Sequence, residues 1–139
     1  MTPQLPFDVR RDACRITAAW RGEWTEDTVT AYAARVRELL AQRSDAFDLV
    51  VDASALERCG ILPLGLLTDL HTEILPRLRR TAFMATRPQM RGLCLWIVRV
   101  SGDANARVLA NELRIDAWLS GTLTREEDAR ARMKGKGPQ

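Results

Sequence analysis

The stretch Phe47-Asp48-Leu49-Val50-Val51-Asp52 has the clearest strand pattern in the chain. Its centre, Leu49–Val51, is apolar at every position, as expected for a central strand in a sheet that is covered on both faces. Asp52 is predicted at the carboxyl end of this strand, and open α/β sheets usually bind ligands at that edge. The sequence therefore predicts a central strand with a candidate site just beyond it.

Strands and helices are predicted to alternate on both sides of this stretch. Arg10-Arg11-Asp12 can turn one short strand into the next as a hairpin, and Thr25 is a suitable N-cap for the first helix. The order β-β-α-β-α-β-α-β-α predicts a single-domain α/β fold, with helices packed on a mixed, mostly parallel sheet with right-handed crossovers. Besides 47–52, the predicted strands are 7–12, 15–20, 81–86 and 107–110, and the predicted helices run from 25 to about 43, 61 to about 76, 88 to 101 and 112 to 119.

Two parts of the chain differ in pattern. Residues 1–121 form the predicted domain, and residues 122–139 form a helical or frayed tail. Thr124-Arg125-Glu126-Glu127 has the spacing of a capping box, which predicts a short helix to Met133. The Gly-rich end after Met133 is expected to fray.

The composition limits the possible classes of protein. Of the 139 residues, 46% are apolar and 28% charged, which is typical of a folded globular domain and excludes a disordered chain. No apolar run approaches the ~20 residues of a membrane-spanning helix. The chain starts without the charged and apolar pattern of a signal peptide, so a cytoplasmic location is expected.

Charge and cysteine usage argue against several kinds of site. The net charge is +3, but the arginines are scattered rather than interleaved with aromatic residues, so no specific nucleic-acid site is predicted. The cysteines, Cys14, Cys59 and Cys94, are widely spaced, and His71 is the only histidine. Neither a disulfide framework nor a metal site is indicated, and no cofactor is predicted.

Four segments together carry a family resemblance. They are 49–56, with the central strand and its Asp, then 81–85, Arg107-Val108-Leu109, and the closing Ile115-Asp116-Ala117-Trp118-Leu119. In these segments the chain is similar to the STAS superfamily, and most of all to its SpoIIAA-like (STAS/SEC14-type) bacterial members. This resemblance implies regulation through contacts with a protein partner, without catalysis.

The sequence departs from the resemblance at one functional position. Regulatory members of the family carry a phosphorylatable serine in an Asp-Ser-x-Gly turn at the start of the second helix. Alignment on the glycine of Glu57-Arg58-Cys59-Gly60 places Arg58 there, and counting forward from Asp52 places Ile61 there. We therefore predict no phosphorylation switch at this turn. Ser54 is the only hydroxyl between Asp52 and the second helix, and it is expected to bond the loop backbone.

The best candidate site is the loop predicted between the central strand and the second helix. A helix N-terminus attracts anions, and Arg58 could assist in binding a carboxylate or phosphate; the alternative is a plain connecting loop. Cys59 could be an activated thiol or a small buried residue, and His71 lies too far along the helix, about 18 Å, to act as its base. No catalytic residue is assigned. The predicted contact residues are Asp52, Ser54, Glu57, Arg58, Cys59 and Gly60.

The third predicted helix is the second candidate contact surface. Leu95 and Trp96 extend its apolar arc almost to a full circle, so we expect another subunit, a ligand or the C-terminal tail to cover it. A homodimer through this helix is one possibility. The alternative function is a small-molecule or lipid-binding module with an apolar pocket between helices and sheet, lined by Leu62, Leu66, Trp96 or Ile97. An enzyme ranks last, because no nucleophile–base pair or phosphate-binding loop is recognisable.

Overall fold

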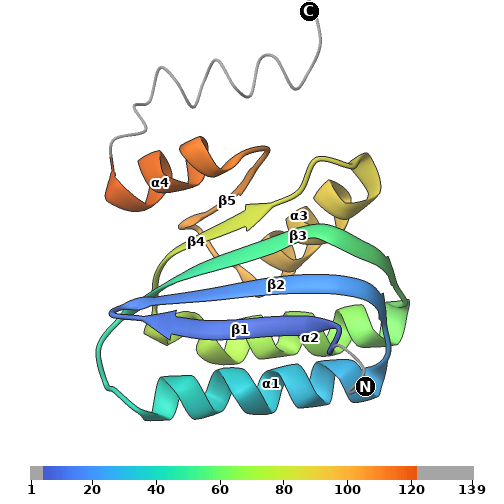
Figure 1. Ribbon diagram of the computed structural model, residues 1–139, viewed down its shortest axis with the longest axis horizontal. Coiled ribbons are helices and arrows are strands. Elements are labelled where there is room, and N and C mark those ends of the chain that lie inside the picture. The colour runs from blue at the N-terminus through green and yellow to red at the C-terminus, as the bar shows by residue number, and fades with distance from the viewer. Residues whose placement is uncertain (1–4, 122–139) are drawn as a thin grey trace, which may run out of the picture.

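The computed structural model describes residues 5–121, so the predictions for the 122–139 tail lie outside the described residues (Figure 1). These residues form one five-stranded sheet with four α-helices and a short 3-10 helix, η1. The elements are β1 (Phe7–Asp12), β2 (Arg15–Trp24), α1 (Glu26–Ala41), β3 (Phe47–Cys59), α2 (Ile61–Ile74), η1 (Leu75–Arg77), β4 (Leu78–Met84), α3 (Pro88–Ser101), β5 (Ala106–Leu109) and α4 (Glu112–Ser120).

The strands follow one another across the sheet in chain order, β1-β2-β3-β4-β5. β1 and β2 form the predicted antiparallel hairpin, and the remaining neighbours pair in parallel. β3 is the central strand, and its side chains from Phe47 to Val51 are buried. The predicted mixed α/β fold is thus confirmed.

The central strand is much longer than predicted. β3 continues past Asp52 to Cys59, because β2 also continues past Trp20 to Trp24 and the two strands stay paired. Two register shifts, between Ala19 and Arg21 and between Gly22 and Glu23, each place one extra residue on β3. Such β-bulges bend a strand and re-aim its side chains. The predicted loop from Ala53 to Gly60 is therefore wrong: nearly all of it is bulged strand.

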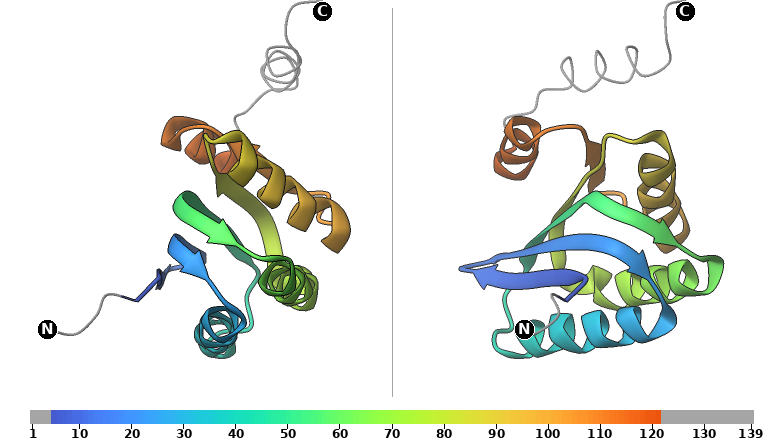
Figure 2. Two further views of the ribbon diagram at one scale, coloured as in Figure 1. Left: turned by 90° about the vertical axis from the view of Figure 1, so that its right-hand side faces the viewer. Right: turned by 45° about the vertical axis from the view of Figure 1, so that its right-hand side comes forward.

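Helices α1, α2 and α3 cover one face of the sheet, which we call the packed face (Figure 2). Its core contains an aromatic cluster in which Trp20 lies 5.1 Å from Trp24, 5.7 Å from Tyr32 and 6.0 Å from Phe83, between ring centroids. Thr25 caps α1 as predicted, and its Oγ1 accepts a hydrogen bond from the backbone N–H of Thr28 at 3.3 Å.

The opposite face carries only α4 among the described helices, packed on β4 and β5. A smaller core forms beneath α4 from Val50, Ala82, Leu109, Ile115 and Leu119. Trp118 is half-buried at the margin of this core. Its indole donates to the carbonyl of Thr81 at 3.1 Å and stacks against two guanidinium groups, which lie 4.4 and 4.8 Å from the ring centroid. The half of this face that is formed by β4 and β5 is therefore covered by one short helix, α4.

Several helix faces differ from prediction. α2 begins at Ile61 and buries Leu67 and Leu70, but it leaves Leu62 exposed and Leu66 partly exposed, although both were expected to line an apolar pocket. α3 buries Ile97. Leu62 and Leu66 lie outside the face of α2 that packs against the rest of the protein. Val100 on α3 and Leu113 on α4 are exposed for the same reason.

The arginines after α2 form hydrogen bonds within the protein. Arg77 donates to the carbonyls of Leu40 and Asp45 at 3.2 Å. Arg79 donates to both carboxylate oxygens of Asp48, through Nε to Oδ1 at 2.9 Å, and to the carbonyl of Leu119 at 3.0 Å. These bonds tie β4 to its neighbours at the start of the strand.

Candidate functional site

Asp52 lies in the middle of β3 and supports one of its bulges. Its Oδ1 accepts a hydrogen bond from the backbone N–H of Ser54 at 2.9 Å and another from the Ser54 hydroxyl. The expectation that the Ser54 hydroxyl bonds the backbone is therefore wrong, because the carboxylate two residues earlier is a stronger acceptor. Asp52 and Ser54 are brought together on the surface of the sheet. The second bulge of β3 separates them from α2.

The remaining predicted contact residues lie at the far end of β3. Glu57 and Arg58 are exposed, and Arg58 lies 3.8 Å from the carboxylate of Glu23 on β2. Gly60 caps α2 with an extended backbone and without a side-chain cap. The half-buried Cys59 thiol has its pKa raised by burial to about 11, so it stays protonated at neutral pH and is a poor nucleophile.

Two apolar side chains project into solvent directly after these residues. Ile61 is 88% exposed and Leu62 is 68% exposed in the first turn of α2. We call Arg58, Gly60, Ile61 and Leu62 the contact edge. Leu62 was expected to line an apolar pocket, and no role was predicted for Ile61. The available signal was a pair of apolar residues directly before Pro63, at the very start of the helix.

The outward face of α3 is also apolar. Trp96 is 54% exposed, and Leu95 and Val100 are exposed beside it. Leu66 does not join them: it lines a shallow depression between α1 and α2, together with Val29 and Asp69. The predicted grouping of Leu66 with Trp96 is therefore wrong, and covering of α3 by another molecule stays a prediction.

The interior between helices and sheet offers no room for a ligand where one was expected. The space beside Ile97, Trp20 and His71 measures about 10 Å³, enough for one water molecule at most. Leu62 and Trp96, two of its expected lining residues, face solvent. The prediction of an apolar pocket between these helices and the sheet is therefore wrong, because aromatic side chains fill the space on the packed face.

His71 is a buried side chain of α2. Its Nε2 lies 2.8 Å from Oδ2 of Asp103, which follows α3, and both side chains are at most 5% exposed. Burial disfavours the charge on Asp103, but the hydrogen bonds from His71 and from the backbone N–H of Asn105 outweigh it and lower the pKa of Asp103. The pair joins α2 to α3, far from Cys59.

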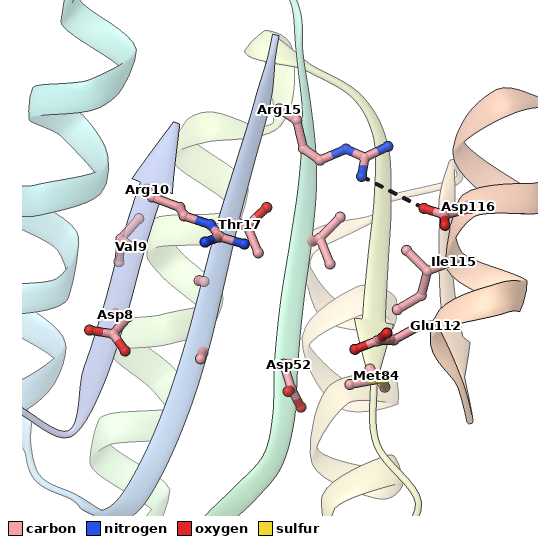
Figure 3. Close-up of a pocket in the computed structure, with 13 residues that line it drawn as sticks. Asp8, Val9, Arg10, Arg15, Thr17, Asp52, Met84, Glu112, Ile115 and Asp116 are labelled. Carbon is pink, nitrogen blue, oxygen red and sulfur yellow. Dashed lines mark ion pairs between the residues drawn. The ribbon is translucent and has the colours of Figure 1, made fainter. Parts of the chain in front are cut away.

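A charged groove lies on the open side of the sheet, beside α4 (Figure 3). It has a volume of about 640 Å³, a floor that includes Thr17, Ala19 and Val50, and an apolar wall from Met84 and Ile115. Arg15 on β2 lies 3.7 Å from the carboxylate of Asp116 on α4. Sequence analysis predicted Asp52 in a site but did not predict this one. Its charged lining residues are Asp8, Arg10, Arg15, Asp52, Glu112 and Asp116.

Within residues 5–121, no group of three or more histidine, cysteine or acidic side chains is arranged to hold a metal ion. None of the helices in this range is long and apolar enough to cross a membrane.

Comparison with solved structures places this arrangement among known folds. An uncharacterised DUF3478 protein with a SpoIIAA-like fold from Shewanella loihica superimposes with a TM-score of 0.62, at 13% identity, over 86% of this chain and 98% of that chain. The chain has a SpoIIAA-like fold. The anti-sigma factor antagonist SpoIIAA in its unphosphorylated form shares this fold, with a TM-score of 0.61 at 16% identity over 83% of this chain and 96% of that one.

A third structure with the SpoIIAA-like fold is an anti-sigma factor antagonist from Mycobacterium paratuberculosis. Its TM-score is 0.54, at 19% identity, over 85% of this chain and 93% of that chain. No family model and no curated protein matches the sequence. The predicted STAS-type fold is confirmed by these structures, and at such identities they speak for the fold alone.

Proposed function

We propose that this chain is a non-enzymatic regulatory domain that binds a protein partner through the contact edge. The observation that carries the proposal is the exposure of Ile61 and Leu62 in the first turn of α2, at the carboxyl end of the central strand. Two similar structures are anti-sigma factor antagonists, so an anti-sigma factor is the partner class to test first. Arg58 adds a positive charge beside the apolar pair, which favours a partner surface with an apolar pocket and a carboxylate.

The proposal includes the absence of a phosphorylation switch at this edge. No serine, threonine or tyrosine occurs from Ala55 to Leu67, so the turn has no acceptor hydroxyl. Ser54 lies closest, but its hydroxyl already bonds the Asp52 carboxylate, and a phosphate there would be repelled by that charge. The partner is therefore expected to bind without regulation by phosphate at this position.

The test is a binding measurement with matched surface variants. Isothermal titration calorimetry would compare the full chain with its Leu62→Asp variant against anti-sigma factors from the same genome. Burial of one leucine in an interface contributes about 1.5–3 kcal/mol, so Leu62→Asp should weaken binding at least about tenfold. The melting temperature should not change, because Leu62 is mostly exposed.

Leu113→Asp is the control for this test. Leu113 is also an exposed leucine near the start of a helix, but it lies on α4, away from the contact edge. It should bind like the unmodified chain. Equal affinity of the Leu62→Asp and unmodified proteins for a confirmed partner would contradict the proposal.

We also propose weak self-association through α3. Leu95, Trp96 and Val100 form an exposed apolar strip, and the same face carries Arg99. α3 contains no carboxylate, so two copies would bring like charges together and salt should strengthen the contact. Sedimentation velocity should detect a dimer that grows with protein and salt concentration and is lost in Trp96→Glu. A monomer at millimolar concentration would contradict it.

A further inference from the structure

The groove beside α4 leaves a mostly parallel sheet half covered. Such sheets normally have both faces packed, yet over β1, β2 and β3 the groove face is open to solvent. Ala19, Met84 and Ile115 contribute apolar surface to it. A segment that lies along the groove would bury this surface against α4 and the sheet.

Charge in the groove is ordered from one end to the other (Figure 3). Arg10 and Arg15 lie at one end, where Asp116 faces Arg15, and Asp52 and Glu112 lie at the other. In the β2–β3 register, Asp52 is opposite Ala19, four residues from Arg15, so the two ends are separated by about 13 Å. Arg15 has only the 3.7 Å contact to Asp116. Neither Arg10 nor Glu112 forms an ion pair within the described part of the chain.

The chain leaves α4 at the basic end of this groove. Ser120, the last residue of α4, lines a hollow together with Arg15 and Arg79. Gly121 then turns the backbone with a positive φ of 78°. A segment that turns back from this point runs antiparallel to α4 and passes first the arginines and then the carboxylates.

The sequence after Gly121 carries the opposite order of charge. After Arg125, the acidic residues Glu126, Glu127 and Asp128 come first, and four basic residues follow them. The six residue-to-residue steps from 126 to 132 span about 9 Å as a helix and about 20 Å as a strand, which brackets the separation of the two groove ends. The basic residues of the second part are Arg130, Arg132, Lys134 and Lys136.

We propose that residues 122–139 of the same chain bind in this groove, antiparallel to α4. The acidic part contacts Arg10 and Arg15, and the basic part contacts Asp52 and Glu112. The segment thereby covers the open half of the sheet face. This inference does not depend on the proposed partner, because the contact edge lies at the carboxyl end of β3 and the groove lies along its middle.

The test reverses the order of charge in the segment of the full chain. The variant carries Glu126→Arg, Asp128→Arg, Arg130→Glu and Arg132→Glu. It keeps the net charge, and it also keeps opposite charges four residues apart, so local pairing within the segment is preserved. None of these residues belongs to the described domain, so the fold should not be affected.

The readout is the set of backbone amide resonances in a nitrogen–proton correlation spectrum. The amides of Thr17, Ala19 and Asp52 should shift between the unmodified chain and the reversed variant, whereas the amide of Arg35 on α1 should not. High salt should move the groove amides of the unmodified chain toward their positions in the variant. Unchanged groove amides would overturn the proposal.

A rescue separates a specific contact from a general effect of charge. Arg10→Glu and Glu112→Arg reverse the groove itself, and neither side chain has an ion pair to lose among residues 5–121. Combined with the reversed segment, they should restore the shifts of Thr17 and Ala19, after thermal unfolding has verified that the domain is folded. Shifts that vanish on dilution would overturn the proposal in favour of binding between two copies.

Discussion

The two faces of this sheet are built from alternate residues of the same strands but differ in what they contain. The packed face holds an aromatic cluster beneath three helices, with Phe83 only 1% exposed. The groove face, reached by the next residue, Met84, is half open and carries six charged side chains in its groove. Stability is therefore expected to come mainly from the packed face, which leaves the groove face available for recognition.

The largest expected effect comes from a pair of neighbouring substitutions on β4. Phe83→Ala should lower the free energy of unfolding by about 3–5 kcal/mol, because it leaves a cavity among Trp20, His71 and Ile97. Met84→Ala, on the half-buried groove face, should cost about 1 kcal/mol. Urea denaturation measures both. Equal losses would show that the two faces contribute equally to stability and would contradict the proposed difference between them.

The next effect concerns the charged pair inside the packed face. Asp103→Asn removes the charge that His71 faces and should lower the free energy of unfolding by about 1–3 kcal/mol near neutral pH. A loss of stability of this size would show that the His71–Asp103 pair helps to hold the otherwise apolar packed face together. A negligible change would mean that the two side chains are individually satisfied.

The same pair predicts a pH dependence of definite sign. The pKa of Asp103 in the folded protein lies below its ordinary value of 3.8, so near that pH the unfolded chain binds more protons. Its contribution is therefore present above that pH and is lost as the pH falls through the folded pKa. Denaturation curves between neutral pH and about pH 3 should show the difference between the unmodified chain and Asp103→Asn shrinking in acid. A difference that grows in acid would contradict the assignment.

Much of the fold was predictable because packing decides it, and the failures have physical causes. The run 47–52 and the cap at Thr25 were predictable from burial and local hydrogen bonding. Beyond Asp52, β3 no longer pairs with β4, which ends at Met84, so this part of β3 pairs with β2 alone. Polar residues are tolerated on such a ribbon, and the strand looks like a loop in the sequence.

The candidate site was less predictable than the fold. The groove exists because α4 lies over β4 and β5 and not over β1 or β2, and no local pattern in the sequence specifies that placement. The burial of His71 likewise depends on Asp103, which is 32 residues away. Asp52 was predicted as a site residue because the central strand was expected to end there. It does line the groove, but from a position in the middle of β3.

Cysteine reactivity offers a further test of the packed face. Cys94 lies in its core, and burial raises the pKa of its thiol to about 12, whereas Cys14 lies exposed in the β1–β2 turn. A thiol reagent at about pH 8 should therefore modify Cys14 first and Cys94 only at the rate at which the packed face opens. Mass spectrometry of digested samples gives both rates. Phe83→Ala should speed modification of Cys94 and leave that of Cys14 unchanged, and Met84→Ala should have a smaller effect on Cys94.

The smallest expected effect lies on the outer surface of the packed layer. Arg37 on α1 and Glu73 on α2 form two hydrogen bonds, of 2.7 and 2.8 Å, that join the helices where both side chains are about half exposed. The bonds lower the pKa of Glu73, but water and salt screen such pairs, so Glu73→Gln should cost no more than about 0.5 kcal/mol. Urea denaturation with and without 1 M NaCl measures this loss, and salt should reduce it. If Glu73→Gln lowered the free energy of unfolding as much as Phe83→Ala, the surface ion pair would hold the helices as strongly as the aromatic core does. The difference between the two faces would then come from the placement of charges and not from burial.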